Sequence, residues 1–204
     1  MTATPDLDTS RLDLDTSRRG AYSSQRGVDP SRSGAAQPSP SGLSESRPSD
    51  SDLLRSVFRR HAAGVAVVTA QGERPVGFTA TSLNSVAAEP PLVSFGVGVS
   101  SSSWPVLAEA EHVGVHILGD HQEELAATFA RSGAERFAPP TSWRTGPRGV
   151  PVLDGVLAWL VCRVVARVPA GDHRLVIAQV VAGDPAGAGR PLLYHQGRFN
   201  ALRD

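Results

Sequence analysis

The sequence contains no lysine, so all 20 of its basic residues are arginine. This absence excludes a Schiff-base lysine and the lysine of a P-loop from the chemistry of the protein. Cysteine is almost absent as well, because Cys162 stands alone and has no partner for an internal disulfide. Since Cys162 alternates with Leu160 and Val164 in an apolar stretch, we expect a small buried side chain rather than a reactive thiol.

The chain also lacks an excess of either charge, with 20 acidic residues against 20 basic ones. This balance gives no reason to expect nucleic acid or an anionic membrane as a partner. No run of 18 apolar residues occurs, and the first residues show neither the apolar segment of a secretory signal nor the scarcity of acids typical of a transit peptide. We therefore expect a cytoplasmic protein that binds neither nucleic acid nor membranes.

The first 50 residues are poor in apolar side chains and rich in serine and proline. Tyr22 is the one aromatic residue there, so too little apolar area is available to offset the entropy lost on ordering. A short repeat, residues 6–11 and again 13–18, is too brief to form a coiled coil. We expect residues 1–50 to be a disordered tail and residues 51–204 to form one folded domain.

The rest of the chain alternates short apolar segments with turn residues, a pattern typical of β-strands. The expected strands are 65–70, 76–80, 83–87, 92–99, 112–118, 159–168, 173–182, 192–195 and 198–201. The expected helices are few and short: 51–61, 104–110 and 120–131. This composition predicts a mainly β protein, a closed or nearly closed antiparallel β-barrel with a few short helices rather than a doubly wound sheet.

Two short patterns are similar to known binding motifs, but the residues around them do not have the secondary structure that those motifs need. Gly96 and Gly98 follow a strand as in a dinucleotide-binding loop, yet the third glycine and the βαβ unit are missing. His112 and His116 have the spacing of a metal pair on a helix. Their segment has the alternation of a strand, in which four residues span about 13 Å, too far for both to bind one zinc ion. We therefore expect structural or dimer-contact histidines.

Three segments stay open between a structural and a functional interpretation. Residues 77–82 are mostly small or carry hydroxyl groups, which suits either a kinked strand or the polar edge of a planar ligand. Residues 100–103 are four serines before a helix start, which suits either a helix cap or a phosphate site. Residues 171–173 put His173 on a tight turn, either as a rim residue or as part of a site.

The order and spacing of several segments, rather than any one of them, resemble the flavin reductase family with the FMN-binding split-barrel fold. The segments are 58–69, 77–82, 90–95, 129–130 with 136–137, 153–155, 171–173 and 191–194. The resemblance covers residues 52–201, and the family includes the reductase components of two-component flavin monooxygenases. It implies an antiparallel Greek-key split barrel and a homodimer that binds FMN or FAD at the subunit interface.

The resemblance also implies a role for each matching residue. The implied cofactor-binding residues are Thr79, Ala80, Thr81 and Ser82 at the edge of the isoalloxazine ring, Asn84 and Ser85 near the ribityl chain, Ser100, Ser101, Ser102 and Ser103 at the phosphate, Phe129 as a wall of the flavin pocket, and Gly171. We expect His173, against the nicotinamide, and its neighbour Asp172 to be catalytic. Many relatives carry Arg or Lys just before the serine run, whereas Val99 stands here, which fits a loosely held flavin.

The implied activity is hydride transfer from NADH or NADPH to the flavin, in which the cofactors hold the reactive electrons and the protein supplies geometry. The reduced flavin would then pass to a separate monooxygenase. Two alternatives stay open, because a fold does not fix a function. One is a split-barrel flavoenzyme that acts directly on another small acceptor, and the other is a non-catalytic flavin-binding or interaction protein.

Overall fold

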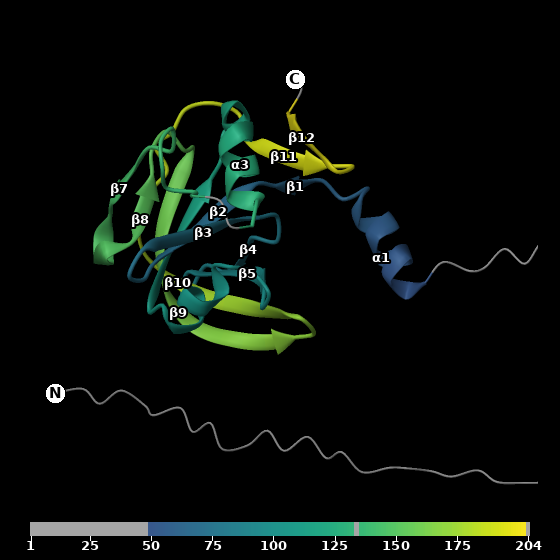
Figure 1. Ribbon diagram of the computed structural model, residues 1–204, viewed down its shortest axis with the longest axis horizontal. Coiled ribbons are helices and arrows are strands. Elements are labelled where there is room, and N and C mark those ends of the chain that lie inside the picture. Colours follow the sequence, from purple (N-terminus) through teal and green to yellow (C-terminus); the bar gives the residue numbers. More distant parts are fainter. Residues whose placement is uncertain (1–48, 133–134, 203–204) are drawn as a thin grey trace, which may run out of the picture. The chain divides into compact units, whose positions relative to one another are not determined.

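A computed structural model describes residues 49–132 and 135–202 (Figure 1). The disorder expected of residues 1–48 lies outside the described residues. The described chain begins with α1 (Asp50–Phe58), and the hydroxyl of Ser49 accepts a hydrogen bond from the amide of Asp52 at 3.2 Å. This side-chain cap and the acids of the first turn stabilise the free amides at the helix start. Ser49 therefore caps a helix that begins at Asp50, and the domain boundary expected at residue 51 stays a prediction.

A seven-stranded sheet in the order β3-β2-β6-β9-β10-β5-β4 forms the body of the domain, and every neighbouring pair is antiparallel. Its strands are β2 (Ala66–Gln71), β3 (Pro75–Ala80), β4 (Asn84–Ala87), β5 (Leu92–Gly98), β6 (His112–Ile117), β9 (Ala158–Ala170) and β10 (His173–Asp184). The mainly β, antiparallel split barrel expected from the sequence is confirmed.

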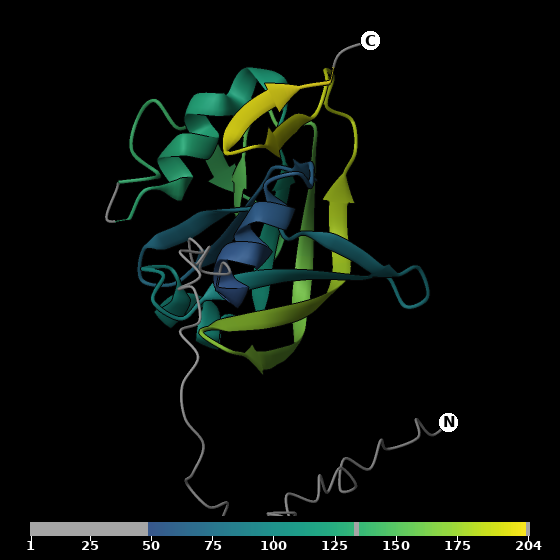
Figure 2. The same cartoon turned by 90° about the vertical axis from the view of Figure 1, so that its right-hand side faces the viewer.

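Two smaller sheets and the helices complete the fold. One sheet joins β1 (Ala63–Gly64), β11 (Leu192–His195) and β12 (Arg198–Ala201), and the other joins β7 (Trp143–Thr145) and β8 (Pro151–Leu153). The helices after α1 are α2 (Trp104–Glu109), α3 (Glu123–Ala130) and the 3-10 turns Asp120–Gln122 and Pro147–Gly149. In both ribbon views, α3 lies beside the β11–β12 hairpin (Figures 1 and 2).

Strand β2 separates two apolar clusters, because its side chains alternate between the two faces of the sheet. Val68 and Ala70 belong to the cluster inside the barrel, together with Phe95, Leu107 and strand residues of β6, β9 and β10. Val67 belongs to a second cluster, which includes Leu118, Ala126, Phe129, Leu153 and Leu192. All of β2 except its last residue is buried, since each face supports one cluster.

Helix α1 has an amphipathic pattern but no buried residue. Its apolar side chains Leu53, Leu54, Val57 and Phe58 are 55–60% exposed. In Figure 1 the helix stands apart from the strands and is joined to them through β1. An apolar stripe of this size left in water marks a surface that needs a partner. No described helix is both long enough and apolar enough to cross a lipid bilayer.

Candidate functional site

Two glycines of β5 leave a strip of bare backbone on one face of the sheet. A Cβ placed on Gly96 would lie 3.4 Å from Oγ of Ser82. A Cβ placed on Gly98 would lie 3.6 Å from Nε2 of His173 and 3.9 Å from Oγ of Ser100. Alternate residues of a strand share a face, so these three polar side chains surround one bare surface. Such a glycine strip lets a flat ligand approach the backbone closely.

The strand register adds an apolar residue to this surface. Leu175 of β10 pairs with Gly96, as His173 pairs with Gly98, and residues two apart on β10 point the same way. Leu175, the third residue of β10, is 39% exposed. The strip, which we call the glycine strip, is therefore bordered by one apolar side chain and by three polar ones.

The segment beyond β3 is held over the glycine strip by hydrogen bonds. The amide of Gly96 donates to Oγ of Ser82 at 2.9 Å, and Nδ2 of Asn84 donates to the carbonyl of Ser82 at 2.9 Å. Asn84 pairs with Ser94, which lies on the same face of β5 as the two glycines. The structure thus brings the predicted residues Ser82 and Asn84 to the strip.

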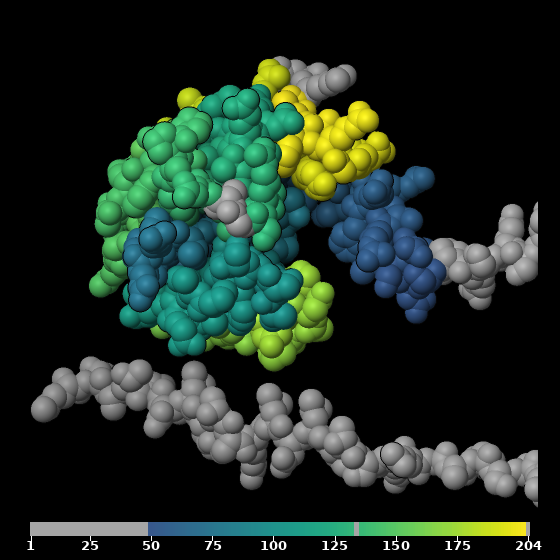
Figure 3. Space-filling model, in the orientation of Figure 1, coloured from purple at the N-terminus to yellow at the C-terminus, as the bar shows by residue number. Residues whose placement is uncertain are grey.

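A cavity of about 660 Å³ lies where α1, the end of β3 and the β11–β12 turn meet. Three predicted residues line it, namely Thr81, Ser82 and Asn84. Its other lining residues are Arg55, Phe58, Arg59, His61, Ala63, Tyr194, His195, Gln196 and Gly197. Figure 3 shows the hollow between α1 and the rest of the domain. The volume is in the range of ligand sites, and the two arginines give it a positive wall that the sequence analysis missed.

The turn between β9 and β10 positions His173. Gly171 takes a left-handed conformation there, with a φ of 58°, which glycine adopts without strain. Nδ1 of His173 lies 2.7 Å from Oδ1 of Asp172, and the amide of Val99 donates to the carbonyl of Asp172 at 3.0 Å. The hydrogen bond from His173 and its charge lower the pKa of Asp172. Asp172 thereby leaves Nε2 of His173 directed toward the glycine strip.

The four serines before α2 do not share one environment. Ser100 is exposed beside the glycine strip, and Oγ of Ser101 accepts from the amide of Ser103 at 3.3 Å. Ser102 is exposed and lines a second cavity. Ser103 is fully buried, where its hydroxyl donates to the carbonyl of Gly77 at 2.9 Å. The hydroxyl of Ser103 is therefore already hydrogen-bonded in the interior, unlike that of the exposed Ser100, and the phosphate contact of the serines stays a prediction.

Three other residues predicted to contact the flavin are Thr79, Phe129 and Ala80. The first two lie between α3 and β3, and the third lies within the barrel. The hydroxyl of Thr79 donates to the carbonyl of Ala126 in α3 at 2.6 Å. The ring of Phe129 is fully buried against β3, and Ala80 is buried on the opposite face of the strand. Both Thr79 and Phe129 lie on the face of β3 that α3 covers, away from the glycine strip, and their predicted contact with the flavin stays a prediction.

Ser85 faces away from the glycine strip. It is exposed in β4 and pairs with Val93, whose side chain faces the barrel interior rather than the bare face of β5. Strand alternation separates it from Asn84, its neighbour in the chain. The predicted contact of Ser85 with a ribityl chain at the strip therefore does not fit this arrangement.

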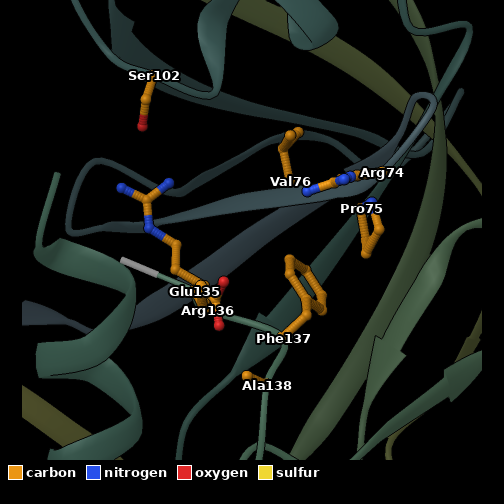
Figure 4. A pocket seen from close by; sticks show the side chains of 8 residues that line it. All are labelled: Arg74, Pro75, Val76, Ser102, Glu135, Arg136, Phe137 and Ala138. Atoms are coloured by element: carbon orange, nitrogen blue, oxygen red, sulfur yellow. The ribbon is translucent and has the colours of Figure 1, made fainter. Parts of the chain in front are cut away.

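The second cavity has a volume of about 400 Å³ and is lined by Arg74, Pro75, Val76, Ser102, Glu135, Arg136, Phe137 and Ala138 (Figure 4). Arg136 is nine-tenths buried, and its Nη1 donates to the carbonyl of Gly77 at 2.7 Å and to Oγ of Ser103 at 2.9 Å. Burial lowers the pKa of this guanidinium. Sequence reasoning had no signal for this burial, because the residues around Arg136 come from distant segments.

Two residues singled out in the sequence belong to the core. Cys162 is buried, which raises the pKa of its thiol to about 12, so the expectation of a structural side chain is confirmed. His116 is also buried, with Nδ1 at 3.0 Å from the carbonyl of Val67. Burial lowers the pKa of His116 to about 4, and its Nε2 has no hydrogen-bond partner among the residues that the structure describes.

Comparison with known proteins gives a consistent result. The flavin reductase like domain family matches residues 58–203. An NADH:FMN oxidoreductase of Rhodococcus qingshengii is 48% identical over 150 residues, covering 71% of this chain and 78% of the relative. The reductase component of a 4-nitrophenol 4-monooxygenase/4-nitrocatechol 2-monooxygenase of Rhodococcus opacus is 37% identical over 156 residues, covering 75% of this chain and 82% of the relative.

A solved structure extends the similarity to the fold. An NADH:FAD oxidoreductase of Streptomyces globisporus C-1027, in complex with NAD and FAD fragments, superposes with a TM-score of 0.72 and 32% sequence identity. The match covers 77% of this chain and 95% of the other. The residues that the family model matches, 58–203, include the glycine strip, the turn at His173, the whole lining of the second cavity and all of the first cavity's lining except Arg55.

Proposed function

Because this chain belongs to the flavin reductase like domain family, we propose that it oxidises NADH and passes the hydride to FMN or FAD. The observation that carries the proposal is the glycine strip of β5, which Ser82, Ser100 and His173 surround. A bare backbone surface with a convergent imidazole suits a flat, stacked pair of rings. The names of similar proteins support the same donor, since both an NADH:FMN and an NADH:FAD oxidoreductase are among them.

The residues at the strip fit a flavin. When bound, the flavin supplies a ring that accepts the hydride. In our proposal the backbone at Gly96 and Gly98 supports the ring, Ser82 and Asn84 border its polar edge, and Ser100 contributes a hydroxyl toward the phosphate. Catalysis then consists mainly of orientation, which is worth about 7–11 kcal/mol in well-aligned cases.

His173 acts in this proposal as the residue that positions the nicotinamide. Asp172 fixes the imidazole through Nδ1, so Nε2 faces the ligand at a constant orientation. Leu175 borders the same surface and limits the access of water to the reacting rings. In the proposed reaction, His173 thus orients the nicotinamide and Leu175 shields the reacting rings from water.

We propose further that the functional unit is a homodimer. The apolar face of α1 is exposed, and the β9–β10 pair adds the exposed side chains Val165, Val168, Leu175 and Val181. Large exposed apolar patches of this kind favour a protein partner. A second copy that covers α1 would also close the cavity of about 660 Å³ that α1 lines.

The reduced flavin would leave for a separate monooxygenase, as the name of the Rhodococcus opacus reductase component describes for that protein. A flavin that must leave is expected to bind weakly, and this agrees with Val99 in place of a basic residue before the serines. The cytoplasmic location stays a prediction from the sequence.

The first experiment is oxidation of NADH or NADPH by the purified protein, with FMN, FAD or no flavin added. We expect NADH oxidation that saturates with added flavin. No oxidation under any pairing would refute the proposal and favour a non-catalytic flavin-binding protein. Oxidation that needs another small acceptor and no added flavin would favour a flavoenzyme with a direct substrate.

A substitution tests whether His173 acts in the reaction or only stabilises the fold. We expect His173→Ala to lower turnover about 10- to 100-fold, because the nicotinamide loses its orienting group, with little change in FMN affinity. His121→Ala is the matched control, since His121 is an exposed histidine far along the chain from the strip. Equal turnover in His173→Ala and the control would exclude His173 from the mechanism.

A further inference from the structure

The cavity of about 660 Å³ beside α1, which we call the α1 cavity, is lined by several basic side chains and by no acidic one of the described chain. Arg55 and Arg59 come from the end of α1, and His61 and His195 add two imidazoles. Arg55 makes one exposed ion pair, with Asp52 at 3.4 Å, whereas the guanidinium of Arg59 has no partner among the described residues. Because nothing in the lining neutralises these arginines, the cavity favours an anionic ligand.

Two exposed aromatic rings line the same cavity. Phe58 is 60% exposed, and its ring packs edge-on against His61 at a centroid distance of 5.9 Å. Tyr194 is 37% exposed and packs in the same manner against Phe199 at 5.5 Å. Exposed rings that a neighbour holds in place offer a surface on which a flat apolar ligand can stack. The lining therefore combines positive charge with aromatic surface.

The turn between β11 and β12 fixes the end of α1 at the cavity. Gln196 and Gly197 take left-handed conformations there, with φ of 53° and 80°. The amide of Gln196 donates to the carbonyl of Arg59 at 3.0 Å, and Tyr194 pairs with Ala63 in the small sheet. Backbone contacts thus hold the arginine and the aromatic ring at one cavity, as expected of a site that is formed before its ligand binds.

The α1 cavity adjoins the glycine strip without including it. Ser82 and Asn84 line the cavity and also border the strip. The two glycines of the strip, Gly96 and Gly98, and the imidazole of His173 are not part of the cavity lining. A ligand in the cavity would therefore contact the segment that borders the strip and leave the bare backbone of β5 uncovered.

We propose that the α1 cavity binds an anionic compound of two or more fused aromatic rings, an aromatic carboxylate or phenolate. The charged group would lie at Arg55 and Arg59, and the rings would lie against Phe58 and Tyr194. The volume exceeds what a single ring fills and is in the range of ligand sites. This ligand is neither the hydride donor nor the flavin, so the site goes beyond the proposed function.

The ligand acts as an effector in this proposal. It contacts α1 on one side and residues 81–84 on the other, so it favours the arrangement in which this segment borders the strip. A flavin on the strip uses the same arrangement, and each ligand should therefore strengthen the binding of the other. This coupling rests on the proposed function, whereas the binding of the aromatic anion does not.

The first test titrates the full chain with 2-naphthoate and with the neutral 2-naphthamide, by calorimetry and without flavin. We expect naphthoate to bind and the amide to bind about tenfold more weakly. Arg59→Gln should weaken naphthoate binding about tenfold, the usual effect of losing a charged hydrogen bond. Arg60→Gln is the matched control, because it removes the same charge one residue along, from an exposed side chain that does not line the cavity.

The second test measures the coupling. FMN should raise the affinity for naphthoate about fivefold, and naphthoate should raise the affinity for FMN by the same factor, because coupling between two sites is reciprocal. The Arg59→Gln variant should lose the effect of naphthoate on FMN at concentrations that suffice for the wild type. Affinities that do not depend on the other ligand would overturn the effector role.

Three further results would overturn the proposal. Equal affinities for naphthoate and the amide would show that the cavity does not recognise the charge. Equal losses in Arg59→Gln and Arg60→Gln would show a general positive field rather than a site. Exclusion of naphthoate by FMN would assign the cavity to the flavin.

Failure of the proposed function gives a different result. A protein that binds naphthoate through Arg59 but oxidises no NADH with any flavin would refute the proposed function and leave the aromatic anion site standing. NADH oxidation that saturates with flavin, in a protein that does not bind naphthoate, would overturn the aromatic anion site alone.

Discussion

The buried histidine His116 predicts how the stability of this domain depends on pH. Its imidazole lies in the core, where Nδ1 is 3.0 Å from the carbonyl of Val67 and Nε2 has no hydrogen-bond partner within residues 49–132 and 135–202. Protonation would place a charge in the core beside Val67, so burial lowers the pKa from 6.5 to about 4. The hydrogen bond to Val67 acts in the opposite direction but is the smaller effect.

The sign and size of the effect follow from proton linkage. Below pH 6.5 the unfolded chain protonates His116 while the folded protein does not, so stability falls as the pH drops toward 4. At about 1.36 kcal/mol per pH unit, the interval from 6.5 to about 4 corresponds to about 3 kcal/mol. The free energy of unfolding should be lower by about 2 kcal/mol of this total at pH 5. Well above pH 6.5 His116 is neutral in both states, so it adds no pH dependence to the free energy of unfolding.

The assay is urea unfolding of the wild type and of His116→Gln at several pH values from 7.5 to 4.5. Glutamine keeps an N–H donor for Val67 and does not titrate in this range, so carboxylates common to both proteins cancel in the difference. The wild type should lose about 2 kcal/mol more than His116→Gln between pH 7 and pH 5. His121→Gln, which changes an exposed histidine, should behave as the wild type. Parallel stability curves for the wild type and His116→Gln would refute the reasoning.

Three further predictions follow from contacts described above. Gly77→Ala should lower the free energy of unfolding by about 1–3 kcal/mol in urea titrations, because the new Cβ would lie 2.8 Å from a core phenyl ring and 2.9 Å from a backbone carbonyl. Gly64→Ala is the control, since nothing lies within 4 Å of its new Cβ, and a similar loss there would contradict the explanation. Leu54→Asp should convert the proposed dimer to a monomer in light scattering, and an unchanged mass would exclude α1 from the interface. Asp172→Asn should lower NADH oxidation severalfold at unchanged FMN affinity, whereas unchanged turnover would show that the carboxylate does not orient His173.

The strand pattern of the folded domain could be predicted from the sequence because local alternation determines it. The strands at 192–195 and 198–201 occur as predicted, and β10 begins at His173 as predicted because Gly171 allows the left-handed turn before it. The β7–β8 pair was not predicted. Each of its strands is three residues long, and the connecting turn contains proline and glycine, so the segment has too little alternation to be recognised.

Local sequence determines which way a side chain points at only some positions of the candidate site. Ser82, Asn84 and His173 border the strip because a turn or a register pair fixes the position of each, and their contacts with flavin and nicotinamide stay predictions. Thr79 and Phe129 were assigned to the flavin, yet they pack between α3 and β3. Which face of β3 is covered depends on a helix more than 40 residues away, and nothing within the strand itself indicates this.

The burial of β2 on both faces has a consequence for how ligand binding can be measured. The inner cluster packs on Val68 and the outer cluster on Val67, so neither can open without exposing the strand that supports the other. The domain should therefore melt in a single cooperative transition, with the slowest hydrogen exchange at the amides of β2. A ligand that binds only the folded state raises the temperature of that whole transition. One thermal-shift experiment would therefore report occupancy of the glycine strip and of the α1 cavity alike.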